Sequence, residues 1–384
     1  MRSLMTMRKF GSSSNSGLSR RTVLQSTAGL LSVPLVGRAT VAWAQEKLAG
    51  SGEVVVFSVG GPFTEGVRRN VYDPFTKATG IKVVDVVADE AEPQAMAMFR
   101  AGKIDWDVID VQSSNYPSMN AAGMFAPIDY SLWDQESLDG VPSRSRLQCG
   151  VTRYSSGVVV GYDERAFPKG GPKNWADFWD VKKFPGPRGL DTTNVRYNFV
   201  FALLADGVAR KDVWPLTDDK LDRAFKKLDE IRPHISKWWT AGGEAPQLLI
   251  NREYVMTSIF DGRAISAIRQ GAPIKFSWVD AYVNYSPISA IMKNGPNTAN
   301  AQKYIAFMNR AQIAAGFTQG TGYPSPNTNQ LKYLPADLIP LLSVNPENSS
   351  KIVVQDSEWL AVKRSDGKTN LEHLRERWLA WRAK

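Results

Sequence analysis

The chain has 384 residues, of which 43% are hydrophobic and 22% charged, and its formal net charge is +9 at pH 7. Six basic residues lie in residues 1–44, which contain no acidic residue, so the rest of the chain carries only +3. Because the basic excess belongs largely to this N-terminal segment, the composition does not favour a nucleic-acid-binding protein. Cys149 is the only cysteine, which excludes an internal disulfide.

The N-terminal segment has the pattern of a secretory signal. Its basic start is followed by an apolar run, Val23–Val36, and by the small-residue site Ala42–Ala44, so we expect cleavage after Ala44. Ser19–Leu24 resembles the twin-arginine export signal, which predicts a protein exported in its folded state. The apolar run is shorter than the ~20 residues that a membrane span needs. We therefore expect a soluble periplasmic protein.

The remaining chain, about 340 residues, is long enough for two domains. Its first part alternates strand and helix patterns, and Gly80 is placed to end the first helix. The expected elements are strand Glu53–Ser58, helix Phe63–Thr79, strand Ile81–Val87, helix Glu92–Ala101, strand Trp106–Val111 and helix Tyr116–Ala122. This order predicts an α/β fold with a mostly parallel sheet flanked by helices. Ligands on such sheets bind beyond the carboxyl ends of strands, which points to the loops Ser58–Phe63 and Gln112–Tyr116.

A second α/β series follows the first. Its expected elements are strand Gly157–Tyr162, helix Trp175–Trp179, strand Gly189–Asp191, helices Arg196–Ala205 and Asp218–Ile231, and strand Ile274–Ser277. A later strand, Ser289–Met292, leads into helix Thr298–Asn309. Two similar series with strands passing between them predict two lobes joined by a hinge, with a ligand pocket in the cleft between the lobes.

The stretch Trp238–Arg263 has the composition of a small-molecule pocket, because it gathers aromatic rings, side-chain amides and a carboxylate around two glycines. Trp238 and Trp239 are adjacent, so in an extended segment they face opposite sides, and we expect Trp239 to face the cleft. Gln247 and Asp261 are its polar candidates. The stretch contains no His, Cys or nucleophile–base pair, so it does not indicate catalysis.

Four segments resemble the periplasmic solute-binding proteins of ABC importers, specifically the spermidine/putrescine-binding branch. They are Phe75–Val83, Trp175–Trp179, Phe260–Arg263 and Gly322–Asn327, and the resemblance covers residues 53–384. It implies a monomer with a two-lobed periplasmic-binding-protein fold that closes on a solute, docks on an inner-membrane permease and catalyses nothing. It places residues 53–155 and 286–322 in lobe 1, and residues 156–285 and 323–384 in lobe 2. We expect no cofactor.

The resemblance also transfers a site, but without its carboxylates. The positions where the family keeps acids that bind ammonium groups fall on Asn194, Tyr197 and Pro287. Since a buried multiply charged amine needs opposing carboxylates, this loss predicts a ligand with a single ammonium group. Arg196 could bind a carboxylate, so a zwitterion held between Asp261 and Arg196 is our hypothesis. The residues expected to bind ligand are Ser58, Phe63, Asn115, Tyr116, Asn194, Arg196, Tyr197, Trp239, Gln247, Asp261, Tyr285 and Tyr323.

Several alternatives stay open from the sequence. Asp261 could cap a turn through backbone contacts, and Arg196 could pair with a surface acid. The same fold could bind a carboxylate, a phosphonate or a sugar, and a secreted hydrolase would be a different class of protein. We find no G-x-S-x-G or H-E-x-x-H motif for a hydrolase, and His234 and His373 have no partner ligands nearby in the sequence for a metal.

Overall fold

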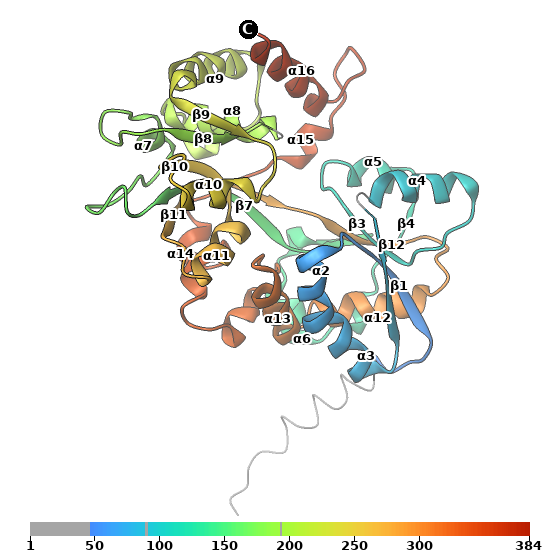
Figure 1. Cartoon of the computed structure of the whole chain (residues 1–384). Coiled ribbons are helices and arrows are strands. Elements are labelled where there is room, and N and C mark those ends of the chain that lie inside the picture. Colours follow the sequence, from blue (N-terminus) through green and yellow to red (C-terminus); the bar gives the residue numbers. More distant parts are fainter. Residues whose placement is uncertain (1–46, 89–90, 193) are drawn as a thin grey trace, which may run out of the picture. The chain divides into compact units, whose positions relative to one another are not determined.

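The structure is a computed structural model that describes residues 47–88, 91–192 and 194–384 (Figure 1). The chain divides into residues 1–43 and residues 44–384, and all the described residues belong to the second of these units. The expected signal segment, residues 1–44, lies outside the described residues. Within the described ranges, no helix has both the length and the hydropathy to cross a bilayer.

A first mixed sheet, of seven strands among the described residues, has the order β2-β1-β3-β12-β6-β5, with β4 paired to β12. β1 runs parallel to β2 and β3, whereas β12 runs antiparallel to β3, β4 and β6. The strands are β1 (Glu53–Ser58), β2 (Lys82–Val87), β3 (Val108–Val111), β4 (Phe125–Ala126), β5 (Arg146–Leu147), β6 (Gly150–Thr152) and β12 (Ile288–Met292).

A second mixed sheet, of six strands in the described part, has the order β13-β11-β7-β10-β8-β9. β8 is parallel to β9 and β10, and β11 is parallel to β13, whereas β7 is antiparallel to β10 and β11. The strands are β7 (Ser155–Asp163), β8 (Arg188–Asp191), β9 (Ile235–Trp239), β10 (Met256–Phe260), β11 (Ile274–Tyr285) and β13 (Val353–Val354).

The two-lobed α/β architecture is confirmed, but the expectation of mostly parallel sheets is wrong in its detail. β1 and β3 run toward the region between the sheets, whereas β12 starts there, having come from the second sheet, and therefore runs against β3. In the same way β7 enters the second sheet and β11 leaves it, so these two strands are antiparallel. Strands that connect two sheets reverse the direction that βαβ units alone would give.

Helices cover both sheets (Figure 1). Those of the first sheet are α2 (Gly61–Val67), a π-helical turn (Arg68–Tyr72), α3 (Asp73–Thr79), α4 (Ala91–Ala101), α5 (Tyr116–Ala121), α6 (Gln135–Gly140), α12 (Thr298–Met308) and α13 (Ala311–Thr321). Those of the second are α7 (Trp175–Trp179), α8 (Val195–Ala205), α9 (Asp218–Ile231), α10 (Glu244–Ile250), α11 (Asp261–Arg269), α14 (Pro346–Ser349), α15 (Ser357–Ala361) and α16 (Asn370–Arg382). The predicted end of the first helix is confirmed, because Gly80 adopts the left-handed conformation at φ +81°.

Each sheet has its own aromatic core. In the first, Phe75 packs edge-on against Tyr304 and Phe307. In the second, the fully buried Trp175 stacks on Phe201 with 3.6 Å between the ring centroids. These separate cores keep the two sheets rigid on either side of the region where they meet.

The C-terminal helix α16 docks on the second sheet through its apolar side. Leu374, Trp378 and Trp381 are buried, and the Trp378 ring packs edge-on against Phe199 of α8. The helix starts with a capping box, in which Thr369 and Glu372 satisfy each other's backbone N–H groups.

The segments that pass between the sheets are hydrogen-bonded to one another. The chain leaves the first sheet after Thr152 and enters the second at Ser155, and it returns between Tyr285 and Ile288. It crosses a third time after α13, through Tyr323 and Pro324, on its way to β13 of the second sheet. The backbone N–H of Arg153 donates to the carbonyl oxygen of Pro287, and that of Ser155 donates to Pro324, each at 2.9 Å. The three crossing segments therefore form one connected strip.

Candidate functional site

A cavity of about 820 Å³ lies where the two sheets meet and is lined by residues from both. Its walls include the loops that follow β1 and β3, the first turns of α4 and α8, and the crossing from β11 to β12. Ligands of α/β proteins bind at such carboxyl ends of strands, and the volume falls within the range of small-molecule sites. The cavity is therefore the candidate ligand site.

Seven of the residues expected to bind ligand line this cavity, and five do not. Three lie in the loops that the carboxyl-end rule indicated, three lie at the start of α8, where the resemblance indicated a site, and one follows α13. They are Ser58, Phe63, Asn115, Asn194, Arg196, Tyr197 and Tyr323. The five that do not line it are Tyr116, Trp239, Gln247, Asp261 and Tyr285.

Trp239 belongs to the core rather than to the cavity, contrary to the sequence prediction. Its side chain is fully buried, and its indole N–H donates to Thr257 Oγ1 at 3.1 Å. Trp238 lies on the other face of β9, where it packs on Trp378 and Trp381 of α16. Adjacent strand residues alternate between the two faces of a sheet, and protein covers both faces here. Neither indole therefore lines the ligand site.

Three other predicted residues make contacts outside the cavity. The Tyr116 ring stacks on Phe125 in the core of the first sheet, with 5.7 Å between centroids. Gln247 lies on the exposed face of α10. The Tyr285 hydroxyl accepts a hydrogen bond from Arg144 at 3.2 Å, and the same guanidinium covers its ring. None of these three side chains therefore lines the cavity.

Asp261 is the main correction, because it had been expected to bind the ligand's ammonium group. It is the first residue of α11, and its side chain is fully buried. Its Oδ1 accepts hydrogen bonds from the backbone N–H groups of Gly157 and Gly262, and its Oδ2 is buried without a partner among the described residues. Burial raises the pKa of this carboxyl group from its ordinary value of 3.8 to about 7, against the effect of the backbone donors. The geometry matches the alternative in which Asp261 caps a turn.

Asp261 should make the stability of the protein depend on pH. Because its pKa is higher in the folded than in the unfolded chain, its proton stabilises the fold below pH 4, and that stabilisation is lost as the pH rises to about 7. In urea unfolding, we expect the free energy of unfolding of the wild type to fall by roughly 2 kcal/mol more between pH 5 and pH 7 than that of Asp261→Asn. Equal changes in the two proteins would contradict this role.

An aromatic wall forms one side of the cavity. Phe63, Tyr154 and Tyr323 all line it, and their ring centroids are 5.1 to 6.3 Å apart. They come from α2 and from two of the crossing segments. Such a wall can cover the alkyl part of a small solute.

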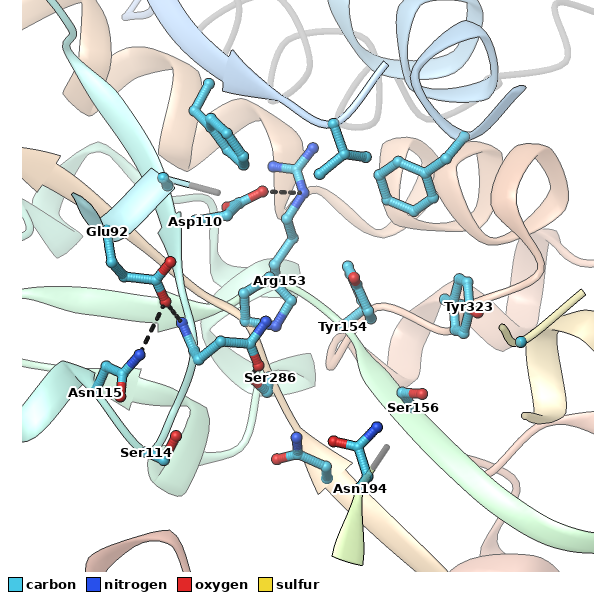
Figure 2. A pocket seen from close by; sticks show the side chains of 18 of the residues that line it. Glu92, Asp110, Ser114, Asn115, Arg153, Tyr154, Ser156, Asn194, Ser286 and Tyr323 are labelled. Atoms are coloured by element: carbon cyan, nitrogen blue, oxygen red, sulfur yellow. Dashed lines mark hydrogen bonds and ion pairs between the residues drawn. The ribbon is translucent and has the colours of Figure 1, made fainter. Parts of the chain in front are cut away.

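A buried ion pair lies deeper in the cavity wall. Arg153 Nε lies 3.2 Å from Asp110 Oδ2, and 4% of the arginine side chain and 15% of the aspartate side chain are exposed (Figure 2). Ser289 Oγ donates to the other carboxylate oxygen of Asp110. Since Asp110 and Arg153 neutralise each other, this pair adds little net charge to the cavity.

Glu92 presents a carboxylate on the first-sheet side of the cavity. It lies in the first turn of α4, where the helix dipole favours a negative charge. Its Oε1 accepts the backbone N–H of Gln112 at 2.8 Å and the side-chain amide of Asn115 at 3.3 Å (Figure 2). The loop after β3 therefore fixes this carboxylate in the wall.

Three arginines line the second-sheet side of the cavity. They are Arg196 of α8, Arg263 of α11 and Arg375 of α16. Arg196 donates from Nε to Gln355 Oε1 at 2.8 Å, and its guanidinium lies over the Tyr197 ring. Glu372 also lines this side, but its carboxylate accepts from the backbone N–H and hydroxyl of Thr369. This wall is therefore positive.

Apart from Arg196, the charged residues that line the cavity were not among the predicted site residues. Glu92 follows β2, so applying the carboxyl-end rule to that strand as well would have found it. Asp110 is near the end of a correctly predicted strand. Arg153 and Arg375 carried no such signal, since Arg153 lies on a segment that crosses between the sheets and Arg375 lies in the middle of α16, away from any strand end.

The chain matches a family model described as bacterial extracellular solute-binding protein over residues 70–336. It is 32% identical over 347 residues to a gamma-aminobutyric acid-binding protein of Pseudomonas aeruginosa, a match that covers 90% of this chain and 95% of the relative. It is 24% identical to the spermidine/putrescine-binding periplasmic protein of Escherichia coli, with 77% of this chain and 84% of that protein covered.

Solved structures show the same similarity. An ABC transporter protein from Rhodopseudomonas palustris superposes with a TM-score of 0.71 at 33% identity, covering 86% of this chain and 99% of that one. A GABA receptor superposes with a TM-score of 0.74 at 28% identity, covering 86% and 98%.

Proposed function

This chain belongs to the bacterial extracellular solute-binding protein family, and on that basis we propose that it captures a small solute carrying one ammonium and one carboxylate group. Members of the family bind small solutes for ABC transporters and work with a membrane permease, and they are not enzymes. The cavity between the sheets is the proposed solute site.

The opposite charges of the two cavity walls carry this proposal. Glu92 faces the cavity from the first sheet, and Arg196, Arg263 and Arg375 line it from the second. A zwitterion can satisfy both walls, with its ammonium group at Glu92 and its carboxylate at the arginines. The relative that binds gamma-aminobutyric acid (GABA) supports a ligand of this class.

A polyamine fits the cavity less well, although the Escherichia coli relative is a polyamine-binding protein. Of the acids in the wall, Asp110 is paired with Arg153, and Glu372 caps α16. A second ammonium group would therefore meet guanidinium groups in a region of low dielectric, which costs several kcal/mol. The chain therefore belongs to the family, but the ligand that we propose for it is not a polyamine.

The remaining expectations belong to the same proposal. Residues 53–155 with 286–322 would move as one lobe and residues 156–285 with 323–384 as the other, closing over the bound solute. The mature protein would act as a periplasmic monomer after twin-arginine export. The two crossings at Thr152–Ser155 and Tyr285–Ile288, which lie near these boundaries, support the division.

A thermal-shift screen tests the proposed ligand class. A ligand at about 100 times its Kd stabilises the native state by roughly 2.7 kcal/mol, which raises the melting temperature by several degrees. We expect GABA and amino acids of similar length to produce this shift, and putrescine, spermidine and sugars to produce little. A shift with polyamines alone would overturn the proposal.

A further inference from the structure

Gln355 lies behind the cavity wall, directly after β13, and 8% of it is exposed. It does not line the cavity. Its Oε1 accepts two hydrogen bonds, one from Arg196 Nε at 2.8 Å and one from the Tyr282 hydroxyl at 2.6 Å. Both lone pairs of the amide oxygen are therefore used to hold residues of the second sheet.

The amide nitrogen of Gln355 reaches toward the first sheet. Its two N–H groups are shared among three acceptors, Ser357 Oγ at 2.7 Å, Asn284 Oδ1 at 3.2 Å and Ser113 Oγ at 3.3 Å. Ser113 belongs to the loop after β3, and its hydroxyl also donates to Asn284 at 3.1 Å. One buried side chain thus connects Arg196 to the first sheet through protein hydrogen bonds.

The same network continues to Glu92. The backbone N–H of Ser113 donates to Ser286 Oγ at 3.0 Å, and Ser286 Oγ donates to Gln112 Oε1 at 3.1 Å. The backbone N–H of Gln112 in turn donates to Glu92 Oε1 (Figure 2). A continuous polar path therefore joins the two charged groups that the proposed function assigns to the two ends of the ligand.

This path has a consequence for recognition. With its Nε bound to Gln355 and its guanidinium over the Tyr197 ring, Arg196 is held in the cavity wall as a cation that can pair with a carboxylate. When the lobes close on a solute, the path sets how near that guanidinium comes to the Glu92 carboxylate, since both groups lie in the cavity wall. Two charged anchors at a fixed spacing discriminate between ligands by length, because a ligand of the wrong length leaves one buried charge unpaired.

We propose that Gln355 is a positioning residue that sets the length of zwitterion the cavity accepts. It touches no ligand itself and acts by fixing Arg196 against the loop after β3. This inference rests on the proposed function, since it requires a ligand with charges at both ends.

Calorimetric titration of an ω-amino acid series tests the proposal, with β-alanine, GABA, 5-aminovalerate and 6-aminohexanoate as probes. We expect the wild type to favour one chain length clearly. In Gln355→Met, which keeps the volume but removes the hydrogen bonds, we expect the best ligand to bind about tenfold more weakly or worse. The ratio between the best ligand and its neighbours in length should also fall.

Gln330→Met is a matched control. Gln330 is another fully buried glutamine with side-chain hydrogen bonds, to Thr318 and the Ser325 carbonyl, and it does not line the cavity. Its substitution should lower the melting temperature and leave the length preference unchanged. If Gln355→Met does not fold, Ser113→Ala cuts the same path at its first-sheet end and should broaden the length preference.

The outcomes separate this inference from the proposed function. A wild type that binds none of the series overturns both. A wild type with a clear length preference that Gln355→Met or Ser113→Ala retains, with all affinities lowered by one common factor, overturns the positioning role and leaves the proposed function standing.

Discussion

Replacing Arg196 with methionine is expected to weaken the binding of a GABA-like zwitterion by about 100-fold or more, because loss of one partner of a buried charge pair typically costs 2–5 kcal/mol. Methionine keeps much of the side-chain volume against Tyr197 but removes the charge that faces the cavity. Isothermal titration calorimetry measures the effect directly.

Two comparisons sharpen this test of Arg196. Arg69→Met changes an exposed arginine outside the cavity and should leave the affinity as it is. Butylamine, which lacks the carboxylate, should lose little affinity through Arg196→Met, because it makes no ion pair with the guanidinium. An equal loss for butylamine and GABA would assign Arg196 a structural role instead.

Asp110→Asn is expected to lower the free energy of unfolding by about 3–5 kcal/mol, because it leaves the buried Arg153 guanidinium without its counter-charge. Chemical denaturation measures this change. Asp105→Asn is the matched control: its ion pair with Lys103 is exposed, so its loss should cost under about 1 kcal/mol. Adding Arg153→Met to Asp110→Asn should restore most of the lost stability. A single Asp110→Asn variant as stable as Asp105→Asn would contradict the stabilising role of the pair.

The fold was largely predictable because its signals are local. β1 spans Glu53–Ser58 and α9 spans Asp218–Ile231, as the hydrophobic patterns indicated, and Gly80 ends its helix as expected. The strand directions were less predictable. A pattern of apolar residues does not record from which sheet a strand arrives, so the antiparallel course of β7 and β12 became visible only in the structure.

Site residues were predictable where they follow the carboxyl end of a strand. They were not predictable where packing between distant segments decides which side chains are buried. Ser58 and Phe63 were found because they follow a strand. Trp239 was wrongly placed, since whether a strand residue faces a cavity depends on what packs against that face, and Ala245 and Leu249 of α10 belong to the same buried cluster as Trp239. Asp261 has the residue type of an ammonium ligand, but its position at the start of α11 directs its carboxylate to backbone N–H groups.

Asp261 and Glu92 together change the ligand hypothesis without reversing it. The proposed ligand is still a zwitterion, but its ammonium group is now assigned to Glu92 instead of Asp261. Glu92 lies on the first-sheet side of the cavity, whereas Asp261 begins α11 of the second sheet. This arrangement places the two ends of the ligand on different sheets. A solute that contacts both walls can stabilise a closed state, because it gains its full interaction only when the walls approach each other.

The most direct test of the central claim is a calorimetric comparison of GABA, butylamine and butyrate on the wild-type protein. If the cavity recognises both charges, GABA should bind at least about 100-fold more tightly than either analogue, since each lacks one of the two charged contacts. Comparable affinity for butylamine and GABA, or tighter binding of putrescine than of GABA, would contradict recognition of a zwitterion between the two walls.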